Sequence, residues 1–213
     1  MNKQLGNKVY QQLKCDIRNH DLPVGVPLKQ QALSDKYAVS RIPIRDALQQ
    51  LKAEGWLVSV GKRGLMIPPL CADEAEDLYR IRVEVEPMIL PYVIESMTNQ
   101  VLGEAEDFLN IIDSNQSLGV LEHGELNWQF HAVLYKVAKR STLFNTISSL
   151  HQQCERYIGF HTRNLGYKVQ SQEEHYHLLT AIRNRNLRES QAILKAHIGK
   201  AGEQLTDYLK NNP

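Results

Sequence analysis

Three histidines in the second half of the chain lie on apolar stripes with helical spacing. His131, His175 and His197 belong to separate segments, and each recurs with leucine, isoleucine or alanine at helical intervals, which predicts that each imidazole faces a helical core. Asn127 comes one turn before His131 and shares its face. Imidazole nitrogens with one oxygen ligand suit Zn²⁺, Ni²⁺ or a similar divalent ion, and a bundle core is a common place for such a site. These four side chains are the candidate metal ligands, although a single histidine on an apolar face is more often a packed core residue.

Four further side chains could act beside these histidines. Arg82 lies on an apolar stripe, and Glu86 follows it by one helical turn. Arg82 either forms a structural ion pair with Glu86 or binds a carboxylate ligand through two parallel hydrogen bonds. Tyr157 and His161 share another helical face and are candidate pocket residues, with packing as the alternative. The remaining histidines are expected at the surface: His20, His123, His151 and His177.

A second group of residues could bind nucleic acid. Residues 39–48 read VSRIPIRDAL, in which Ser40 is a good helix N-cap and Arg41 and Arg45 share one face of the first turns. Pro43 falls in the first turn, where its missing N–H removes no intrahelical bond but does remove a donor for the Ser40 hydroxyl. Two arginines beside the electropositive end of a helix suit phosphates and base edges. A solvated charged face is the alternative for this pair taken alone.

The elements around this motif are short and closely spaced. An amphipathic helix is expected over 5–20, a Pro-Gly turn follows, and two further helices are expected over 29–38 and 40–53. Gly55 can end the last of these helices. The runs WLVSV and LMI favour strands, and the GKRG between them predicts a hairpin with a basic tip. Three helices followed by a two-stranded wing predict a winged helix-turn-helix.

Residues 8–67 resemble the DNA-binding domain of the GntR family of bacterial transcription regulators. The resemblance is carried by a Pro-Gly turn, a leucine-centred helix, the VSRIPIRDAL recognition helix, the following L-x-x-x-G and a glycine-flanked wing. It implies that the recognition helix contacts operator phosphates and guanine edges and that the wing tip reaches the adjacent minor groove. The residues concerned are Ser40, Arg41, Arg45, Gly61, Lys62 and Arg63. Ile42 stands where such proteins often carry Thr or Gln, so a polar contact is lost there.

The second half resembles the FCD domain, the helical effector-binding half of one GntR branch, over most of residues 74–200. Asn127-x-x-x-His131, then Glu174-His175, then His197-Ile198 match the motifs of its metal-binding members. The resemblance implies a divalent metal that helps to hold a small organic acid. The family usually has aspartate where this chain has Asn127, and Arg82 and Glu86 match its first-helix R-x-x-x-E.

Charge divides the chain in the same way. Residues 1–70 hold 11 Lys and Arg against 5 Asp and Glu, a net charge of +6, and residues 71–213 hold 14 against 19, a net charge of −5. A basic small unit joined to an acidic larger one indicates a polyanion-binding module attached to a second function. We therefore expect a DNA-binding domain over 1–70 and an all-helical effector, metal-binding and dimerisation domain over 71–213.

The overall composition fits a globular protein, with 42% hydrophobic and 23% charged residues. No stretch approaches the roughly 18 apolar residues of a membrane span, and the first residues lack the apolar core of a signal peptide. Cys15, Cys71 and Cys154 are far apart and outside any metal spacing. They predict inert thiols in a reducing cytoplasm.

The expected fold is mainly α, with an N-terminal winged helix-turn-helix and a C-terminal all-α helical bundle. The expected function is that of a ligand-responsive transcription regulator, with a repressor as the preferred form. It would bind a pseudo-palindromic operator as a homodimer, and it would bind a small carboxylate effector through a divalent metal. A constitutive repressor with a structural histidine core is one alternative. A metal-dependent hydrolase or lyase fused to a DNA-binding domain is disfavoured, because no general base can be named beside the ligands.

Overall fold

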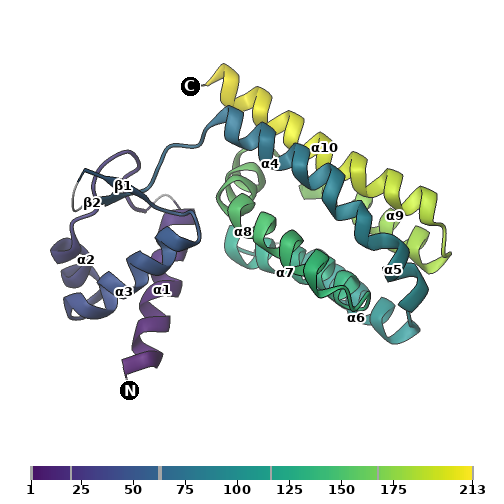
Figure 1. Ribbon diagram of the computed structural model, residues 1–213, viewed down its shortest axis with the longest axis horizontal. Helices are drawn as coiled ribbons and strands as arrows, with labels where there is room; N and C mark the ends of the chain where they lie inside the picture. The colour runs from purple at the N-terminus through teal and green to yellow at the C-terminus, as the bar shows by residue number, and fades with distance from the viewer. Residues whose placement is uncertain (1, 20, 62–63, 116, 167, 213) are drawn as a thin grey trace. The chain divides into compact units, whose positions relative to one another are not determined.

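The computed structural model describes residues 2–19, 21–61, 64–115, 117–166 and 168–212. It divides into two compact units, Met1–Leu70 and Cys71–Pro213, and most of each is helix (Figure 1). The predicted fold class, mainly α with a small wing in the first unit, is therefore confirmed. Within the described ranges, no helix is both long enough and apolar enough to cross a membrane.

In its described residues, the first unit contains three helices and a two-stranded antiparallel sheet. Its elements are α1 (Asn2–Arg18), α2 (Gln30–Tyr37), α3 (Arg41–Ala53), β1 (Val58–Val60) and β2 (Gly64–Met66). The Pro-Gly segment before α2 joins the wing, because Gly25 N donates to Ile67 O at 2.9 Å and Leu28 N donates to Leu65 O at 2.8 Å. The result is a winged helix-turn-helix, in which the loop expected as a simple turn also extends the sheet.

The sequence explains how α3 is held in this unit. Ser40 is the N-cap, with extended backbone, and Pro43 sits in the first turn. The apolar face of α3 is fully buried: Ile44, Ala47, Leu48 and Leu51 are at most 3% exposed. Gly55 follows the helix with φ of +82°, a conformation that favours glycine. The opposite face of α3 is consequently left at the surface.

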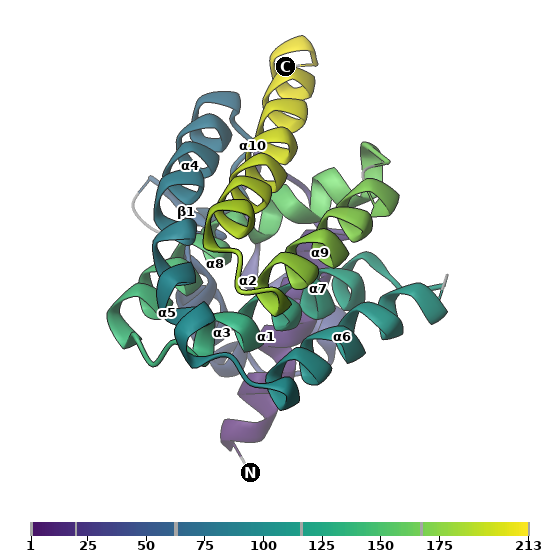
Figure 2. The same ribbon diagram turned by 90° about the vertical axis from the view of Figure 1, so that its right-hand side faces the viewer.

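The second unit is a bundle of helices from α4 to α10. They are α4 (Ala72–Val85), the 3₁₀ turn η1 (Glu86–Ile89), α5 (Leu90–Ser96), α6 (Asn99–Ser114), α7 (Val120–Lys136), α8 (Ser141–Asn164), α9 (Lys168–Arg183) and α10 (Leu187–Asn211). Pro87 accounts for the break between α4 and α5, because proline has no N–H and restricts the backbone of its neighbours. Figure 2 shows α9 between α10 and α6, in agreement with their contacts.

Helices α4 and α10 pack side by side along most of their length (Figure 1). Gly202 of α10 makes this approach possible, since a Cβ built there would lie 2.6 Å from the Cβ of Tyr79 on α4. A Cβ does not come within about 3 Å of a carbon atom of a distant residue, so a larger residue at position 202 would force the two helices apart. This contact positions α10, and with it His197, against the rest of the bundle.

Candidate metal centre and nucleic-acid interface

The three histidines expected to face the core come together in the second unit. His131 of α7, His175 of α9 and His197 of α10 are at most 8% exposed. One ring nitrogen from each lies within 4.8 Å of those of the others, and the Nε2 atoms of His131 and His175 are 3.2 Å apart. Three imidazole nitrogens at this spacing form a cluster that could hold a divalent metal ion.

The other nitrogen of each ring faces an oxygen acceptor. The Nδ1 of His197 lies 2.8 Å from Glu174 Oε2, and that of His175 lies 3.5 Å from Gln172 Oε1. The Nδ1 of His131 lies 3.4 Å from the Tyr135 hydroxyl. A proton on Nδ1 satisfies all three acceptors, which leaves the Nε2 lone pairs as the ligand atoms; outer hydrogen bonds of this kind orient metal-binding histidines in proteins.

The electrostatic surroundings keep two of these rings neutral. Burial lowers the pKa of His131 and of His175 well below the usual range, and the neighbouring imidazole of His197 adds to this. A neutral imidazole is the form that ligates a metal, so little proton release is needed on binding.

Asn127 lines the same cavity as His131 and His197. Its Oδ1 is buried and has no hydrogen-bond partner among the residues that the structure describes. A buried carbonyl oxygen without a partner costs stability unless something binds it. An amide oxygen one turn from His131 is a suitable fourth ligand, so the residues present fit a divalent ion.

Arg82 and Glu86 form the structural ion pair that was one of the two predicted alternatives. The Nε of Arg82 donates to Glu86 Oε1 at 2.6 Å, and both side chains are buried. The Tyr135 hydroxyl donates to the other carboxylate oxygen at 2.9 Å. A hydrogen-bonded chain thus runs from Arg82 through Glu86 and Tyr135 to His131. It holds the His131 ring at Nδ1, the nitrogen that does not face His175.

A cavity of about 50 Å³ opens beside the cluster. Two of its lining residues, His123 and His151, were expected at the surface; that prediction is wrong, since they are only 9% and 7% exposed. His151 of α8 stacks on Trp128 with ring centroids 4.1 Å apart. His123 lies one turn before Asn127 on α7, and burial, followed by the ammonium of Lys168, lowers its pKa. His177 is exposed as expected, and His20 lies outside the described residues.

The two candidate pocket residues of α8 differ in their surroundings. His161 lines the cavity and its Nε2 lies 2.9 Å from Gln204 Oε1. Tyr157 is buried elsewhere: its hydroxyl accepts from the Cys71 amide at 3.2 Å and donates to Glu74. Tyr157 therefore fixes the start of α4 and is not one of the cavity-lining residues.

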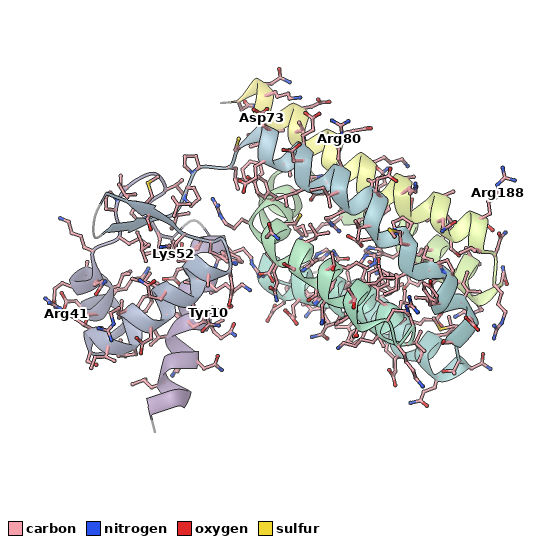
Figure 3. All side chains as sticks on the ribbon, viewed as in Figure 1. Tyr10, Arg41, Lys52, Asp73, Arg80 and Arg188 are labelled. Carbon is pink, nitrogen blue, oxygen red and sulfur yellow. The ribbon has the colours of Figure 1, made fainter. Side chains whose placement is uncertain are left out.

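In the first unit, Arg41 projects from the start of α3 at the outer surface (Figure 3). Its Nε donates to Gln31 Oε1 at 2.7 Å, and one terminal nitrogen donates to the same oxygen. Gln31 in turn donates to Asp35 at 2.7 Å. The guanidinium is thus held by α2 along one edge, which leaves its remaining N–H groups for an outside acceptor. Gln31 of α2 thus positions this arginine.

The other residues at the start of α3 are exposed as well. Arg45 lies 3.6 Å from Asp46, with both side chains more than 60% exposed. The Ser40 hydroxyl makes no capping hydrogen bond within the described part of the chain, in keeping with Pro43 having no N–H. Ile42 is 58% exposed, and an apolar side chain there suits the methyl group of thymine. Gly61 has φ of +57° at the end of β1; Lys62 and Arg63 lie outside the described residues.

Comparison with known proteins relates both units to established families. The model of bacterial regulatory proteins of the gntR family matches residues 5–67, and that of the FCD domain matches residues 77–200. The Nta operon transcriptional regulator of Aminobacter aminovorans is 27% identical over 87% of both chains. The transcriptional repressor GlaR of Escherichia coli is 23% identical over 89% of this chain and 90% of its own.

Solved structures share the fold of the whole chain. E. coli McbR/YncC superposes with a TM-score of 0.77 and 21% identity, covering 98% of this chain and 99% of its own. A GntR-family regulator from Pseudomonas syringae pv. tomato has a TM-score of 0.60 and 26% identity, covering 99% of this chain and 88% of its own.

Proposed function

The chain belongs to the GntR family of bacterial transcription regulators, with an FCD domain as its helical half, and on this premise we propose that it is an effector-responsive repressor. The family consists of DNA-binding regulators, not enzymes. As a homodimer, the protein would bind a pseudo-palindromic operator. A small organic acid, bound in the helical domain through a divalent metal, would alter the affinity for that operator.

On the DNA side, the start of α3 supports the proposal. Arg41 and Arg45 are exposed beside the N-terminus of the helix, and the Ser40 hydroxyl is available to a phosphate. Arg41 would bind a guanine edge with the N–H groups that Gln31 does not use. Ile42 would contact a thymine methyl, and Gly61, Lys62 and Arg63 would follow the adjacent minor groove.

On the effector side, the observation that carries the proposal is the buried Asn127 Oδ1, which has no hydrogen-bond partner in the described part of the chain and lines the same cavity as His131 and His197 of the three-histidine cluster. Asn127, His131, His175 and His197 would hold the ion. When bound, the metal supplies a Lewis acid that attracts a carboxylate oxygen. Arg82 and Glu86 line the cavity and orient His131 through Tyr135, and His161 forms part of the wall.

Linkage between the two halves provides the test of this function. An effector acid should change the affinity for operator DNA, and operator DNA should change the affinity for the acid by the same factor. The coupling free energy between the two sites is typically ~1–3 kcal/mol. His175→Ala and His197→Ala should abolish zinc uptake while leaving DNA binding by the effector-free protein intact. Arg41→Ala and Arg45→Ala should each cost ~1–3 kcal/mol of operator affinity. A constitutive repressor with a structural histidine core would take up no zinc, and its operator affinity would be unchanged by any acid.

A further inference from the structure

His123 was expected at the surface but lies inside the cavity wall. It is 9% exposed, and its Nδ1 is buried without a hydrogen-bond partner among the residues described. A neutral imidazole nitrogen in this position costs stability in the same way as the Asn127 oxygen does. Among the residues that the structure describes, Asn127 Oδ1 and His123 Nδ1 are thus unsatisfied polar atoms on two residues that line the cavity, one beside the histidine cluster and one farther along α7.

The spacing on α7 defines the distance between these two groups. His123, Asn127 and His131 follow one another at intervals of four residues and all line the cavity, so each step along the helix is about 6 Å. A ligand bound at the Asn127 end would reach His123 only if its two polar ends were about that far apart. A single carboxylate is too short to contact both.

The charges of the cavity favour an anion at the His123 end as well. Among the lining residues that the structure describes, Glu86 is the acidic one, and its charge is compensated by Arg82. Lys168, at the start of α9, lines the cavity and lies close enough to His123 to affect its ionisation. His123 also lies in the first turn of α7, which begins at Val120, so the positive end of that helix adds to the attraction.

We propose that the cavity binds a short dicarboxylate, with one carboxylate at the histidine cluster and the other hydrogen-bonded to His123 Nδ1 and attracted by Lys168. This inference rests on the proposed function and specifies its effector class. A divalent ion with four neutral ligands has a charge of +2, and Lys168 adds one more; a dianion compensates most of it. The cavity is small, about 50 Å³, which favours a short diacid whose two ends can span about 6 Å, such as succinate; malonate is shorter than this span.

Matched pairs of acids test the proposal on the zinc-loaded full-length protein. Propionate is succinate without its second carboxylate, and acetate is malonate without one. Dissociation constants are measured by calorimetry and by the fluorescence of Trp128, and zinc retention is checked after each titration. A charge-assisted hydrogen bond predicts that at least one diacid binds about 10- to 100-fold more tightly than its monoacid.

Variants assign that difference to His123. His123→Leu should bring the diacid affinity down to that of the monoacid and leave the monoacid affinity unchanged. His123→Gln retains a hydrogen-bonding side chain and should keep part of the difference, and Lys168→Met should reduce it. His177→Leu is the matched control, because His177 is exposed on α9 and should change neither affinity.

Two outcomes separate this inference from the proposed function. If native protein binds both acids of each pair equally, or if His123→Leu weakens both equally, the dicarboxylate assignment is wrong while acid binding through the metal stands. If the zinc-loaded protein binds none of the four acids, or takes up no zinc, the proposed function fails and this inference fails with it.

Discussion

Replacing Asn127 by aspartate restores the residue usual in the family and changes the charge of the candidate metal site by one unit. The Asn127 oxygen is buried in the cavity that His131 also lines, and it has no hydrogen-bond partner among the described residues. Asn127→Asp therefore changes the charge of a proposed ligand atom and little else. The variant should bind zinc more tightly than native protein in the absence of an effector. It should also show a smaller mutual tightening of zinc and acid, because the new carboxylate supplies negative charge that the acid would otherwise bring.

The magnitude follows from two opposing terms. A negatively charged oxygen attracts a divalent ion more strongly than a neutral amide oxygen does, and this attraction is large at the roughly 2 Å of a zinc–oxygen bond. Burying that carboxylate costs several kcal/mol. The difference leaves a gain of ~1–3 kcal/mol, or about 5- to 150-fold in zinc affinity. The coupling between zinc and acid should fall by a similar factor.

Competition with a zinc-binding dye measures the metal affinity of the native protein and of Asn127→Asp. Succinate and propionate titrations with and without zinc measure the coupling. Asn127→Leu is the control: it has a similar size but no oxygen, and it should bind zinc more weakly than native protein. Equal zinc affinities in all three proteins would show that Asn127 is not a ligand. An undiminished coupling in Asn127→Asp would refute the charge argument.

Three further predictions concern other parts of the molecule. Glu174→Gln should lower zinc affinity by about 10- to 100-fold, measured by dye competition, because His197, a proposed ligand, loses the carboxylate that orients its ring. Gln31→Ala should weaken operator binding by ~0.5–1.5 kcal/mol in a mobility-shift titration, but not in an Arg41→Ala background, where its partner is already gone. Gly202→Ala should lower the stability by ~1–3 kcal/mol in thermal unfolding. Gly103→Ala should not, because an added Cβ there would meet no atom of a neighbouring element within 4 Å in the part of the chain that the structure describes.

The sequence was sufficient for the features that depend on one helix or one motif. The order of elements in the first unit follows from caps, turns and alternating strands, and the N-cap position of Ser40 is confirmed. The pairing of Arg82 with Glu86 was one of the two alternatives that their four-residue spacing allowed, and the structure shows it. In each case the interacting groups lie within a few residues of one another, so local periodicity contains the necessary information.

Features that depend on two helices could not be obtained in this way. His123 and His151 were expected at the surface, yet both are buried, and His151 of α8 stacks on Trp128 of α7. Tyr157 was expected in the pocket, but its hydroxyl contacts the start of α4, many residues away. One usable signal was overlooked: His123 precedes Asn127 by four residues, so a cavity that contains the asparagine should extend to that histidine.

Asn127 and His123 together explain how a site with weak intrinsic metal affinity could act as a sensor. A metal site whose ligands already cancel the charge of the ion attracts an incoming carboxylate only weakly. The effector would then bind with little effect on the rest of the domain. A site with neutral ligands, a compensated Arg82–Glu86 pair and Lys168 at its edge retains positive charge. Under the proposed function, much of the binding energy of such a site would be released only when a dianion enters. Because a ligand can shift an equilibrium only by its differential affinity for two states, a site that is completed by its effector is the arrangement that gives the larger response at the operator.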